Sequence, residues 1–175
     1  FSTEFQVDIH DVVTQQRYVQ TWTDNMNEKT KAKITKKSGE LGYAKFIFYP
    51  DLKRFNMSTL DDDIVALFEK RTYDACACTR DDVSVYYNGK KLGFKSFEKY
   101  IDLYIGNKKD TVRVYESNKR WDVCVCHSKD GYKQVSFVNG INTSIGGTHV
   151  EHVSRQLVNK ILDKIAGKSG TSQVK

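Results

Sequence analysis

The residues best suited to chemistry in this chain are four cysteines, which occur as two Cys-x-Cys pairs. Cys76 and Cys78 form the first pair, and Cys124 and Cys126 form the second. Together they would supply four thiolates, which is one ligand set of structural zinc. Structural zinc usually takes a wider spacing on tight turns, and strand alternation places Cys124 and Cys126 on one face of a strand. The pattern therefore favours ordinary reduced thiols over a metal site or a disulfide.

Two other groups contain residue types that bind metals. His149 and His152 stand three positions apart at a predicted helix start, but no third ligand is evident nearby, so a role in the first helical turn is favoured. Residues 61–63 are consecutive aspartates before an apolar run, a pattern typical of helix capping and of the positive end of the helix dipole. We therefore predict no metal site.

The sequence lacks the short motifs that mark common catalytic sites, namely the P-loop, HExxH, G-x-S-x-G and G-x-G-x-x-G. None of its ten tyrosines stands in a recognisable nucleophile context. We therefore predict no catalytic residue in this chain.

The chain has 175 residues and a net charge of +6, which is unevenly distributed. Residues 1–52 hold seven basic and seven acidic side chains, whereas residues 53–175 hold twenty-one and fifteen. This modest surplus is compatible with a polyanionic partner, although many domains without one carry as much. No apolar run reaches the length of a membrane span. The start at Phe1, without a methionine or an apolar leader, leads us to expect an excised segment.

The elements that would position these residues begin with a β-rich stretch. Alternation predicts strands at residues 1–9, 17–22 and 43–49. Pro50, the only proline, ends the third strand because proline cannot donate to a strand ladder. Residues 29–42 are rich in lysine and favour either two strands joined by a hairpin or a mobile loop.

The middle of the chain predicts two helices, a hairpin and further strands. Ser58 or Thr59 caps the first helix, whose expected buried face comprises Ile64, Leu67 and Phe68. Asn88-Gly89 predicts a type I′ turn in a hairpin over residues 83–94. Ser96 caps a short helix through Tyr104. Polar turns then separate three strands, expected as an antiparallel meander, at residues 111–116, 120–126 and 133–138.

The last third predicts a strand, a glycine-hinged loop and a long docked helix. Residues 135–138 form the short buried strand, Asn139-Gly140 bends the chain, and Gly146-Gly147 gives backbone freedom before the helix. Thr148 and Glu151 have the spacing of a capping box. One apolar stripe then recurs at helical spacing, formed by Val150, Val153, Leu157, Val158, Ile161, Leu162 and Ile165.

One segment, residues 136–149, resembles the signature segment of the transducer domain of type IIA DNA topoisomerases, the family that joins eukaryotic topoisomerase II to the gyrase B subunit. Its sequence is Ser-Phe-Val-Asn-Gly-Ile-Asn-Thr-x-x-Gly-Gly-Thr-His. The residues that we assign to this motif and hinge are Asn139, Asn142, Gly146, Gly147, Thr148 and His149. Seven more segments resemble eukaryotic members in family order: residues 1–5, 20–26, 50–57, 60–67, 88–92, 100–104 and 121–124.

The resemblance implies an α/β (α+β) fold in two parts. Residues 1–52 are similar to the last strands of a GHKL (Bergerat) ATPase domain. Residues 53–175 are similar to most of a transducer of the ribosomal-protein-S5-domain-2 type, with a mixed sheet and a long C-terminal helix. The chain would then stop before the Gln-Thr-Lys loop whose lysine reaches the nucleotide phosphates.

The function implied by the resemblance is that of a piece of an ATP-dependent type II DNA topoisomerase. Its transducer would couple ATP binding and hydrolysis, and dimerisation of the N-terminal gate, to the passage of double-stranded DNA. ATP and Mg²⁺ would belong to the homodimeric parent enzyme, and this piece alone would bind neither and be inactive. The parent would be nuclear in a cellular eukaryote, or act at a cytoplasmic replication site in a large DNA virus, and would not be a membrane protein.

The resemblance also implies contact with transported DNA through lysines just after the long helix. The matching positions are Ala166, Gly167 and Lys168, so only one lysine is kept. Lys160 and Lys164, one helical turn apart, would compensate because their long stems let the ammonium groups reach outward. Solvated helix charges without a partner are the alternative interpretation.

Two other functions remain as alternatives. A free-standing nucleic-acid-binding β-sheet would need stacking aromatic rings on an exposed face, whereas Tyr86, Tyr87 and Trp121 lie in ordinary strand alternation. Another GHKL machine, such as a mismatch-repair ATPase or a chaperone, would share the architecture. The Gly-Gly-Thr-His segment at residues 146–149 and the segment at residues 20–26 argue against both.

Overall fold

The computed structural model describes residues 1–109 and 111–170, with side chains described as far as Gly167. Two compact units are present, Phe1–Ile64 and Val65–Lys175. The predicted α/β class with a long C-terminal helix is confirmed. None of the helices in these described ranges has the length and apolar character needed to cross a membrane.

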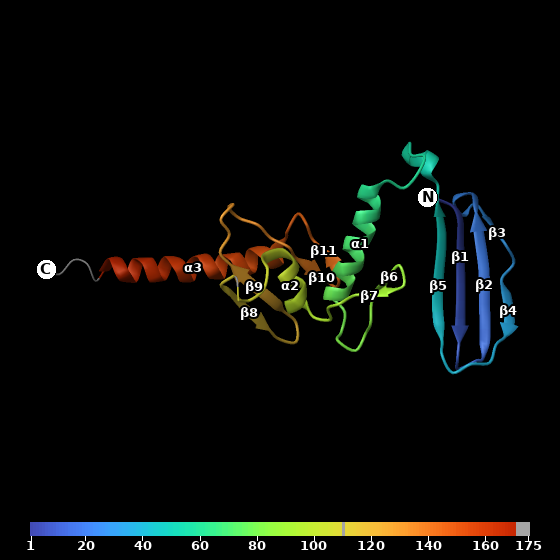
Figure 1. The fold of residues 1–175 in the computed structure, drawn as a ribbon, viewed down its shortest axis with the longest axis horizontal. Coiled ribbons are helices and arrows are strands. Elements are labelled where there is room, and N and C mark those ends of the chain that lie inside the picture. Colours follow the sequence, from blue (N-terminus) through green and yellow to red (C-terminus); the bar gives the residue numbers. More distant parts are fainter. Residues whose placement is uncertain (110, 171–175) are drawn as a thin grey trace. The chain divides into compact units, whose positions relative to one another are not determined.

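The first unit contains a five-stranded antiparallel sheet made of the predicted strands (Figure 1). The strands are β1 (Ser2–Asp11), β2 (Gln16–Thr23), β3 (Glu28–Lys29), β4 (Lys33–Lys36) and β5 (Tyr43–Pro50). Their order is β3-β2-β1-β5, and β4 also pairs with β2. The lysine-rich stretch therefore forms two short strands, in agreement with one of its two predicted alternatives. Two 3-10 turns, η1 (Asp24–Met26) and η2 (Leu52–Phe55), complete the unit.

A carboxylate on β1 is the centre of the polar contacts in this sheet. Arg17 on β2 donates from Nε and from its NH2 group to the two Asp8 oxygens, at 2.8 and 2.5 Å. Tyr43 on β5 donates its hydroxyl to Asp8 Oδ1 at 3.0 Å. The hydrogen bonds from Arg17 are the main cause that lowers the pKa of Asp8 to about 2. Asp8 thus links the three longest strands through side chains as well as through the ladder.

Within its described residues, the second unit combines three helices with three short hairpins. Its helices are α1 (Asp62–Ala77), which begins just before the unit boundary, α2 (Phe97–Ile105) and α3 (Thr148–Gly170). Its strand pairs are β6–β7 (Tyr86–Tyr87 and Lys90–Lys91), β8–β9 (Arg113–Ser117 and Asp122–Cys126) and β10–β11 (Phe137–Val138 and Ile141–Asn142).

Two local predictions in this unit are confirmed. Asn88 and Gly89 both have positive φ angles, +48° and +76°, as the type I′ turn between β6 and β7 requires. The Ser96 hydroxyl accepts a hydrogen bond from the Lys99 amide at 3.3 Å and so caps α2 as predicted.

The prediction for the start of α1 is wrong in two respects. Neither Ser58 nor Thr59 is the cap, because both lie outside the first turn. The cap is Asp61, whose carboxylate accepts the Ile64 amide at 2.9 Å, which confirms the capping role predicted for the aspartates at residues 61–63. The expected buried face is also wrong, because Leu67 and Phe68 are exposed. The residues of α1 that are buried lie near its C-terminal end, and they are Asp74, Cys76 and Ala77.

The predicted three-stranded meander does not form. β8 and β9 pair with each other, but β10 pairs with β11 and not with β9. The physical reason is that Gln134, just before β10, donates its side-chain amide to the carbonyl groups of Thr143 and Ser144. This stretch is held by the loop after β11. A strand does form at Phe137–Val138, and Phe137 is half-buried, but Val135 and Val138 are exposed, so the predicted buried strand at residues 135–138 is confirmed only in part.

The core of the second unit surrounds Tyr100 on α2. Tyr100 and Ile101 are buried together with Cys76 and Ala77 of α1. Four aromatic rings extend the cluster, because Phe94, Phe97, Tyr104 and Phe137 have ring centroids 5.2–6.2 Å from that of Tyr100. Phe94 also contacts Tyr73 of α1 at 5.6 Å. The core therefore joins α1, α2 and β10.

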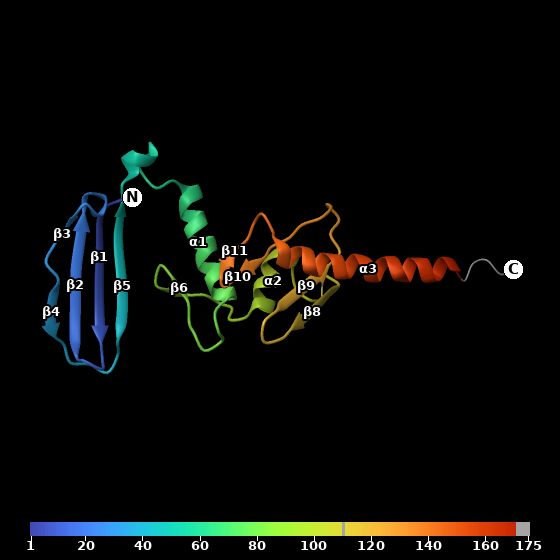
Figure 2. The same ribbon diagram turned by 180° about the vertical axis from the view of Figure 1, so that it is seen from behind.

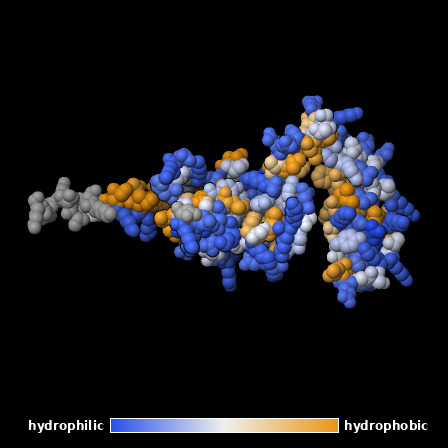
Figure 3. Space-filling view, viewed as in Figure 1, coloured by the Kyte–Doolittle hydropathy of each residue, from blue (hydrophilic) through white to orange (hydrophobic). Residues whose placement is uncertain are grey.

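Helix α3 is only partly covered within its unit. Figures 1 and 2 show its N-terminal part beside α2 and β9 and its remainder projecting from them. The predicted stripe is half-buried at Val150 and Val153 but more than half exposed at Val158, Ile161 and Leu162. Figure 3 shows the resulting hydrophobic surface on the projecting part. The prediction of a helix docked along its length is therefore wrong, because the other elements of the unit end beside its first turns.

Candidate functional site

The candidate site is the segment from Gln134 to Glu151, and it begins with a second Asn-Gly hairpin. Asn139 and Gly140 have φ angles of +51° and +79°, and they join β10 to β11 in the manner of a type I′ turn. The register pairs Phe137 with Asn142. The predicted bend at Asn139-Gly140 is confirmed. Asn139 is exposed and Asn142 is half-buried.

Three polar side chains meet where this hairpin approaches α3, and we call Ser136, Thr143 and His149 the hinge cluster. The Ser136 and Thr143 hydroxyls lie 2.6 Å apart. His149 Nε2 lies 3.0 Å from Thr143 Oγ1 and 3.3 Å from Ser136 Oγ. The Thr143 amide also donates to the Ser136 carbonyl at 2.8 Å. The cluster thus fastens the first turn of α3 to both ends of the hairpin.

Gln134 adds a second fastening outside the hinge cluster. Its Nε2 donates to the Thr143 carbonyl at 3.3 Å and to the Ser144 carbonyl at 2.8 Å. The Gly146 amide donates to the same Thr143 carbonyl at 2.9 Å, which closes the turn that follows β11. No feature of the sequence pattern singled out Gln134, because its partners are backbone groups nine and ten residues away.

The two glycines before α3 have backbone conformations that favour glycine. Gly146 has a φ angle of +87° and Gly147 one of +147°. A Cβ atom on Gly147 would lie 3.0 Å from His149 Cε1, so the imidazole ring also needs the empty space there. The conformation of this segment therefore requires the backbone freedom that was predicted for Gly146-Gly147.

The prediction that Thr148 caps α3 is wrong by one residue. Helix α3 begins at Thr148, and the Gly147 carbonyl accepts the first helical hydrogen bonds, from Val150 at 3.0 Å and Glu151 at 3.1 Å. Gly147 therefore occupies the cap position, for which glycine is also a suitable residue. The conformation of Gly147 turns the chain into the helix one residue earlier than a capping box on Thr148 would.

A buried carboxylate on α1 forms a second polar group near the candidate site. Asp74 is only 2% exposed. It accepts the Tyr100 hydroxyl at 2.6 Å and the Lys70 ammonium at 2.8 Å, and Arg71 lies 3.6 Å away. Burial and the bond to Asp74 both raise the pKa of Tyr100, so this phenol remains a donor. Sequence reasoning missed the pair, although an aspartate beside Cys76 and Ala77 is an unusual member of an apolar face.

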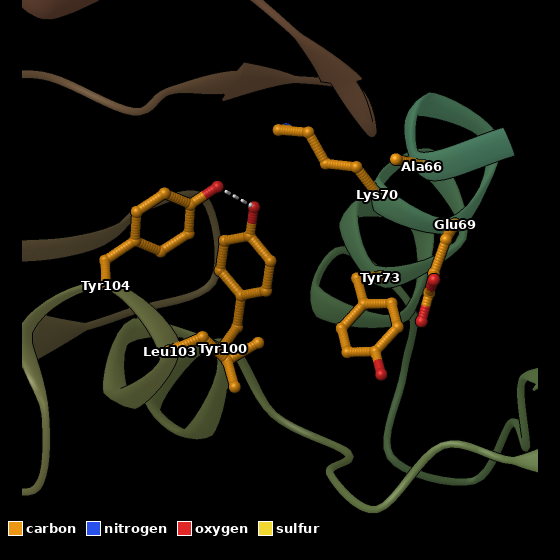
Figure 4. Close-up of a pocket in the computed structure, with 7 residues that line it drawn as sticks. All are labelled: Ala66, Glu69, Lys70, Tyr73, Tyr100, Leu103 and Tyr104. Atoms are coloured by element: carbon orange, nitrogen blue, oxygen red, sulfur yellow. Dashed lines mark hydrogen bonds between the residues drawn. The ribbon is translucent and has the colours of Figure 1, made fainter. Parts of the chain in front are cut away.

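A cavity of about 280 Å³ lies beside this group, between α1 and α2. Figure 4 shows the Tyr100 and Tyr104 hydroxyls pointing toward each other on one side, with Lys70, Glu69 and Tyr73 of α1 on the other. The two hydroxyls lie 2.8 Å apart. Since Tyr100 donates to Asp74, Tyr104 is the donor in this second bond. The two hydrogen bonds therefore run in one direction, from Tyr104 to Tyr100 and from Tyr100 to Asp74.

An ion pair fixes the far side of α2. Asp102 lies 2.7 Å from Arg113 of β8, and the Arg113 side chain is only 3% exposed. Hydrogen bonding to Arg113 is the main cause that lowers the pKa of Asp102. The pair therefore attaches the β8–β9 hairpin to α2. Neither residue was predicted to have this role.

The two histidines of α3 have different partners. His149 belongs to the hinge cluster, whereas the His152 ring lies 6.0 Å from the Trp121 ring beside a groove of about 320 Å³. Among the described residues, no group of three histidine, cysteine, aspartate or glutamate side chains is placed to hold a metal ion. The arrangement of His149 agrees with the role in the first turn that the sequence favoured.

The four cysteines are free thiols. Cys76 is buried and donates its thiol to the Phe94 carbonyl at 3.2 Å, whereas Cys78 is exposed. Burial raises the pKa of Cys76 and Cys124, which disfavours the thiolate that a metal or a nucleophilic reaction needs.

The lysines predicted to contact DNA lie on the projecting part of α3. Lys160 and Lys164 are exposed, one helical turn apart. The side chain of Lys168 lies outside the described residues. The hinge cluster contains none of these lysines, so the structure separates the predicted DNA-contact residues from the predicted hinge.

Known proteins match both the sequence and the fold. The sequence profile of the DNA gyrase B family matches residues 87–174. The DNA topoisomerase 2 of Meyerozyma guilliermondii is 40% identical over 184 residues, which cover 96% of this chain and 13% of that protein. That of Arabidopsis thaliana is 42% identical over 182 residues, which cover 100% of this chain and 12% of that protein. The chain thus spans about an eighth of the length of these relatives.

Solved structures give the same result. The ATPase region of Saccharomyces cerevisiae topoisomerase II superimposes with a TM-score of 0.88 at 40% identity, over 95% of this chain and 44% of that one. The ATPase and transducer domains of DNA topoisomerase II from Balamuthia mandrillaris also give 0.88, at 36% identity, over 96% of this chain and 43% of that one. The chain therefore belongs to the type IIA DNA topoisomerase family, which includes DNA gyrase B.

Proposed function

We propose that this chain couples nucleotide state to DNA passage as part of an ATP-dependent type II DNA topoisomerase. The observation that carries the proposal is 40% identity, with a TM-score of 0.88, to the ATPase region of the yeast enzyme across nearly the whole chain. ATP and Mg²⁺ are bound by other parts of the parent enzyme. This chain contributes no catalytic residue and is inactive alone.

The domain assignment is part of this proposal. Residues 1–52 are the last strands of a GHKL ATPase domain, and residues 53–175 are a transducer of the ribosomal-protein-S5-domain-2 type. A two-part organisation is supported by the two compact units, whose division falls after Ile64. The Balamuthia structure of ATPase and transducer domains supports the order of the two parts.

The transducer works as a lever in this proposal. Helix α3 is a stiff arm, and Gly146-Gly147 is the position where the backbone absorbs changes in φ and ψ. The hinge cluster fixes one setting of that arm, because His149 on α3 bonds to Ser136 and Thr143 on either side of the hairpin. Asn139 and Asn142 shape the hairpin that carries Ser136, and Thr148 begins the arm.

The parent enzyme acts on double-stranded DNA as a homodimer, and it is nuclear in a cellular eukaryote or works at a cytoplasmic replication site in a large DNA virus. Lys160, Lys164 and Lys168 contact transported DNA through its phosphates, without sequence preference. The exposure of Lys160 and Lys164 on the projecting part of α3 supports this assignment.

A filter-binding assay with the purified chain tests the DNA contact. The triple change of Lys160, Lys164 and Lys168 to alanine should weaken binding and reduce the salt dependence of log K by about 0.9 for each lost phosphate contact. A triple change of Lys90, Lys91 and Lys95 to alanine removes the same charge elsewhere and is the matched control. Equal effects of the two variants, or no effect of either, would reject the assignment.

A chimeric enzyme tests the coupling itself. This chain replaces the matching segment of yeast topoisomerase II, and relaxation of supercoiled plasmid and ATP hydrolysis are measured with and without DNA. The proposal predicts relaxation and DNA-stimulated hydrolysis by the chimera, and no hydrolysis by the purified chain alone. Turnover of ATP by the isolated chain would contradict it.

A nucleic-acid-binding sheet is a second candidate, favoured by one observation. Phe46 and Phe48 lie on the same face of β5 and are 62% and 57% exposed. Exposed rings on a sheet can stack on unpaired bases. Replacing both by serine would weaken binding of single-stranded DNA if this sheet binds it. Unchanged affinity would remove this candidate.

A further inference from the structure

Tyr100 of α2 lies between α1 and the β10–β11 hairpin of the hinge cluster. Its hydroxyl donates to Asp74 of α1 at 2.6 Å, and both residues are only 2% exposed. A hydrogen bond to a charged, buried acceptor is among the stronger ones that proteins form. Tyr100 is therefore attached firmly to α1 at its polar end.

The ring of Tyr100 has a different set of partners. It meets the Phe137 ring at 5.8 Å with an interplanar angle of 73°, and Phe97 also meets Phe137, edge-on, at 6.3 Å. Edge-to-face pairs at such distances are favourable and depend on ring orientation. Phe137 is the first residue of β10 and directly follows Ser136 of the hinge cluster. A displacement of Tyr100 would thus displace Phe137 and with it the β10–β11 hairpin.

These contacts form one continuous route from α1 to α3. It runs from Asp74 to the Tyr100 hydroxyl, from the Tyr100 ring to Phe137, and through Ser136 to His149. Each link is a hydrogen bond, a ring contact or a peptide bond. In the sequence, α1 is the first helix after the five-stranded sheet, and α3 is the last helix.

We propose that Tyr100 is a positioning residue that passes the position of α1 to the hinge cluster and so sets the angle at which α3 leaves it. This role rests on the proposed coupling function and names the residue that carries the coupling within the second unit. The polar and aromatic ends of Tyr100 have separate tasks. The hydroxyl moves with α1 because it is bonded to Asp74, and the ring transmits that movement to Phe137 through their contact.

Amide hydrogen exchange in the purified 175-residue chain tests the route without nucleotide or DNA. The probes are the hydrogen-bonded amides of the hinge: Thr143, Gly146, Val150 and Glu151. Tyr100→Phe keeps the ring and removes the hydroxyl. We expect it to raise exchange at these four amides at least fivefold and to leave the Leu92 amide, bonded to Val85 in the other Asn-Gly hairpin, unchanged.

Two variants control for unrelated effects. Tyr104→Phe removes the neighbouring hydroxyl of the same helix but leaves the bond between Tyr100 and Asp74 intact, so hinge exchange should stay within twofold of the unaltered chain. Ile101→Val weakens the core beside Tyr100 without touching the route, and it shows how much exchange general destabilisation causes. The proposal is overturned if Tyr100→Phe affects only α1 and α2, or if either control matches it at the hinge.

A second change tests the other half of the route. Phe137→Leu removes the ring contact and keeps the bond between Tyr100 and Asp74, and it should raise hinge exchange as Tyr100→Phe does. The double variant should show no more than the larger single effect, because both changes interrupt one route. Additive effects, or a silent Phe137→Leu, would overturn the proposal.

The chimeric enzyme supplies a readout that folding alone would not change. Tyr100→Phe should lower the stimulation of ATP hydrolysis by DNA at least threefold while hydrolysis without DNA stays the same. Equal loss of both rates would indicate a structural role only and overturn the proposal. Because the exchange experiment uses no nucleotide or DNA, failure of this inference can be distinguished from failure of the proposed function.

Discussion

The two units hold their buried carboxylates in different ways. In the first unit, Asp8 takes its donors from Arg17 and Tyr43 on the two strands that pair with β1, so strand register places the partners together. In the second unit, Asp74 takes a donor from Tyr100, 26 residues away on another helix, with no ladder to place it. We therefore expect the sheet to keep its shape when this polar contact is lost, and the second unit to depend on such contacts for its arrangement.

Replacing each carboxylate residue by alanine is expected to give the largest change in the free energy of unfolding, and so tests this difference first. Asp74→Ala should lower the free energy of unfolding of the second unit by about 2–3 kcal/mol, because it leaves the buried Tyr100 hydroxyl without its acceptor. Asp8→Ala should cost the first unit less than half as much, because Arg17 can return to water and the ladder remains. Urea denaturation followed by circular dichroism measures both, and a larger loss for Asp8→Ala would contradict the comparison.

Two glycine substitutions extend the test within the second unit, one in the Gly146-Gly147 pair and one in the Asn88-Gly89 turn. Gly147→Ala should destabilise the unit by about 2 kcal/mol, because alanine is strained at this φ and its Cβ would approach His149. Gly89→Ala meets no atom within 4 Å and should cost about 1 kcal/mol for its positive φ alone. Thermal unfolding of the two variants should preserve this order, and equal melting points would show that the space beside His149 is unimportant.

The pH dependence of the first unit gives a smaller and separate effect. The pKa of Asp8 is lowered to about 2 in the folded chain, so Asp8 binds a proton more readily when the chain is unfolded. The stability that this group contributes is present above its unfolded pKa of about 4 and is lost as the pH falls toward about 2. Carbon NMR of the Asp8 carboxyl measures the titration, and Arg17→Met should move it toward higher pH. If the pKa of Asp8 is the same in Arg17→Met as in the unaltered chain, the assigned cause is refuted.

The smallest effect is expected for the exposed lysines of α3. Lys160→Ala together with Lys164→Ala should change the free energy of unfolding by less than about 0.5 kcal/mol, because surface substitutions of this kind rarely do more. The same variant should weaken DNA binding. A marked loss of stability would instead place these lysines in the packing of the unit.

The sequence allowed good predictions where local chemistry decides the structure. The strands of the sheet, both bends at Asn-Gly and the Ser96 cap follow from alternation, positive φ and capping, which act over a few residues. The predicted capping box failed by one residue because Gly147 also satisfies the first helical amides. Local patterns therefore located the candidate segment but not its internal contacts.

Contacts between distant residues could not be predicted in this way. Gln134 replaces the expected third strand of a meander by bonding to backbone carbonyls, and a side-chain pattern contains no information about that choice. The links from Asp74 to Tyr100 and from Asp102 to Arg113 likewise depend on how helices and hairpins meet. The apolar stripe of α3 correctly predicted a helix, but periodicity alone does not state which part of it is covered.

The most direct test of the central claim is ATP hydrolysis by the yeast chimera, measured with and without DNA, for Gly147→Ala against Gly89→Ala. Both changes put a methyl group on a glycine with positive φ, but only Gly147 lies at the proposed hinge. We predict that Gly147→Ala reduces DNA stimulation at least threefold, while Gly89→Ala leaves it unchanged. Equal stimulation in the two variants would contradict the claim that this segment couples nucleotide state to DNA passage.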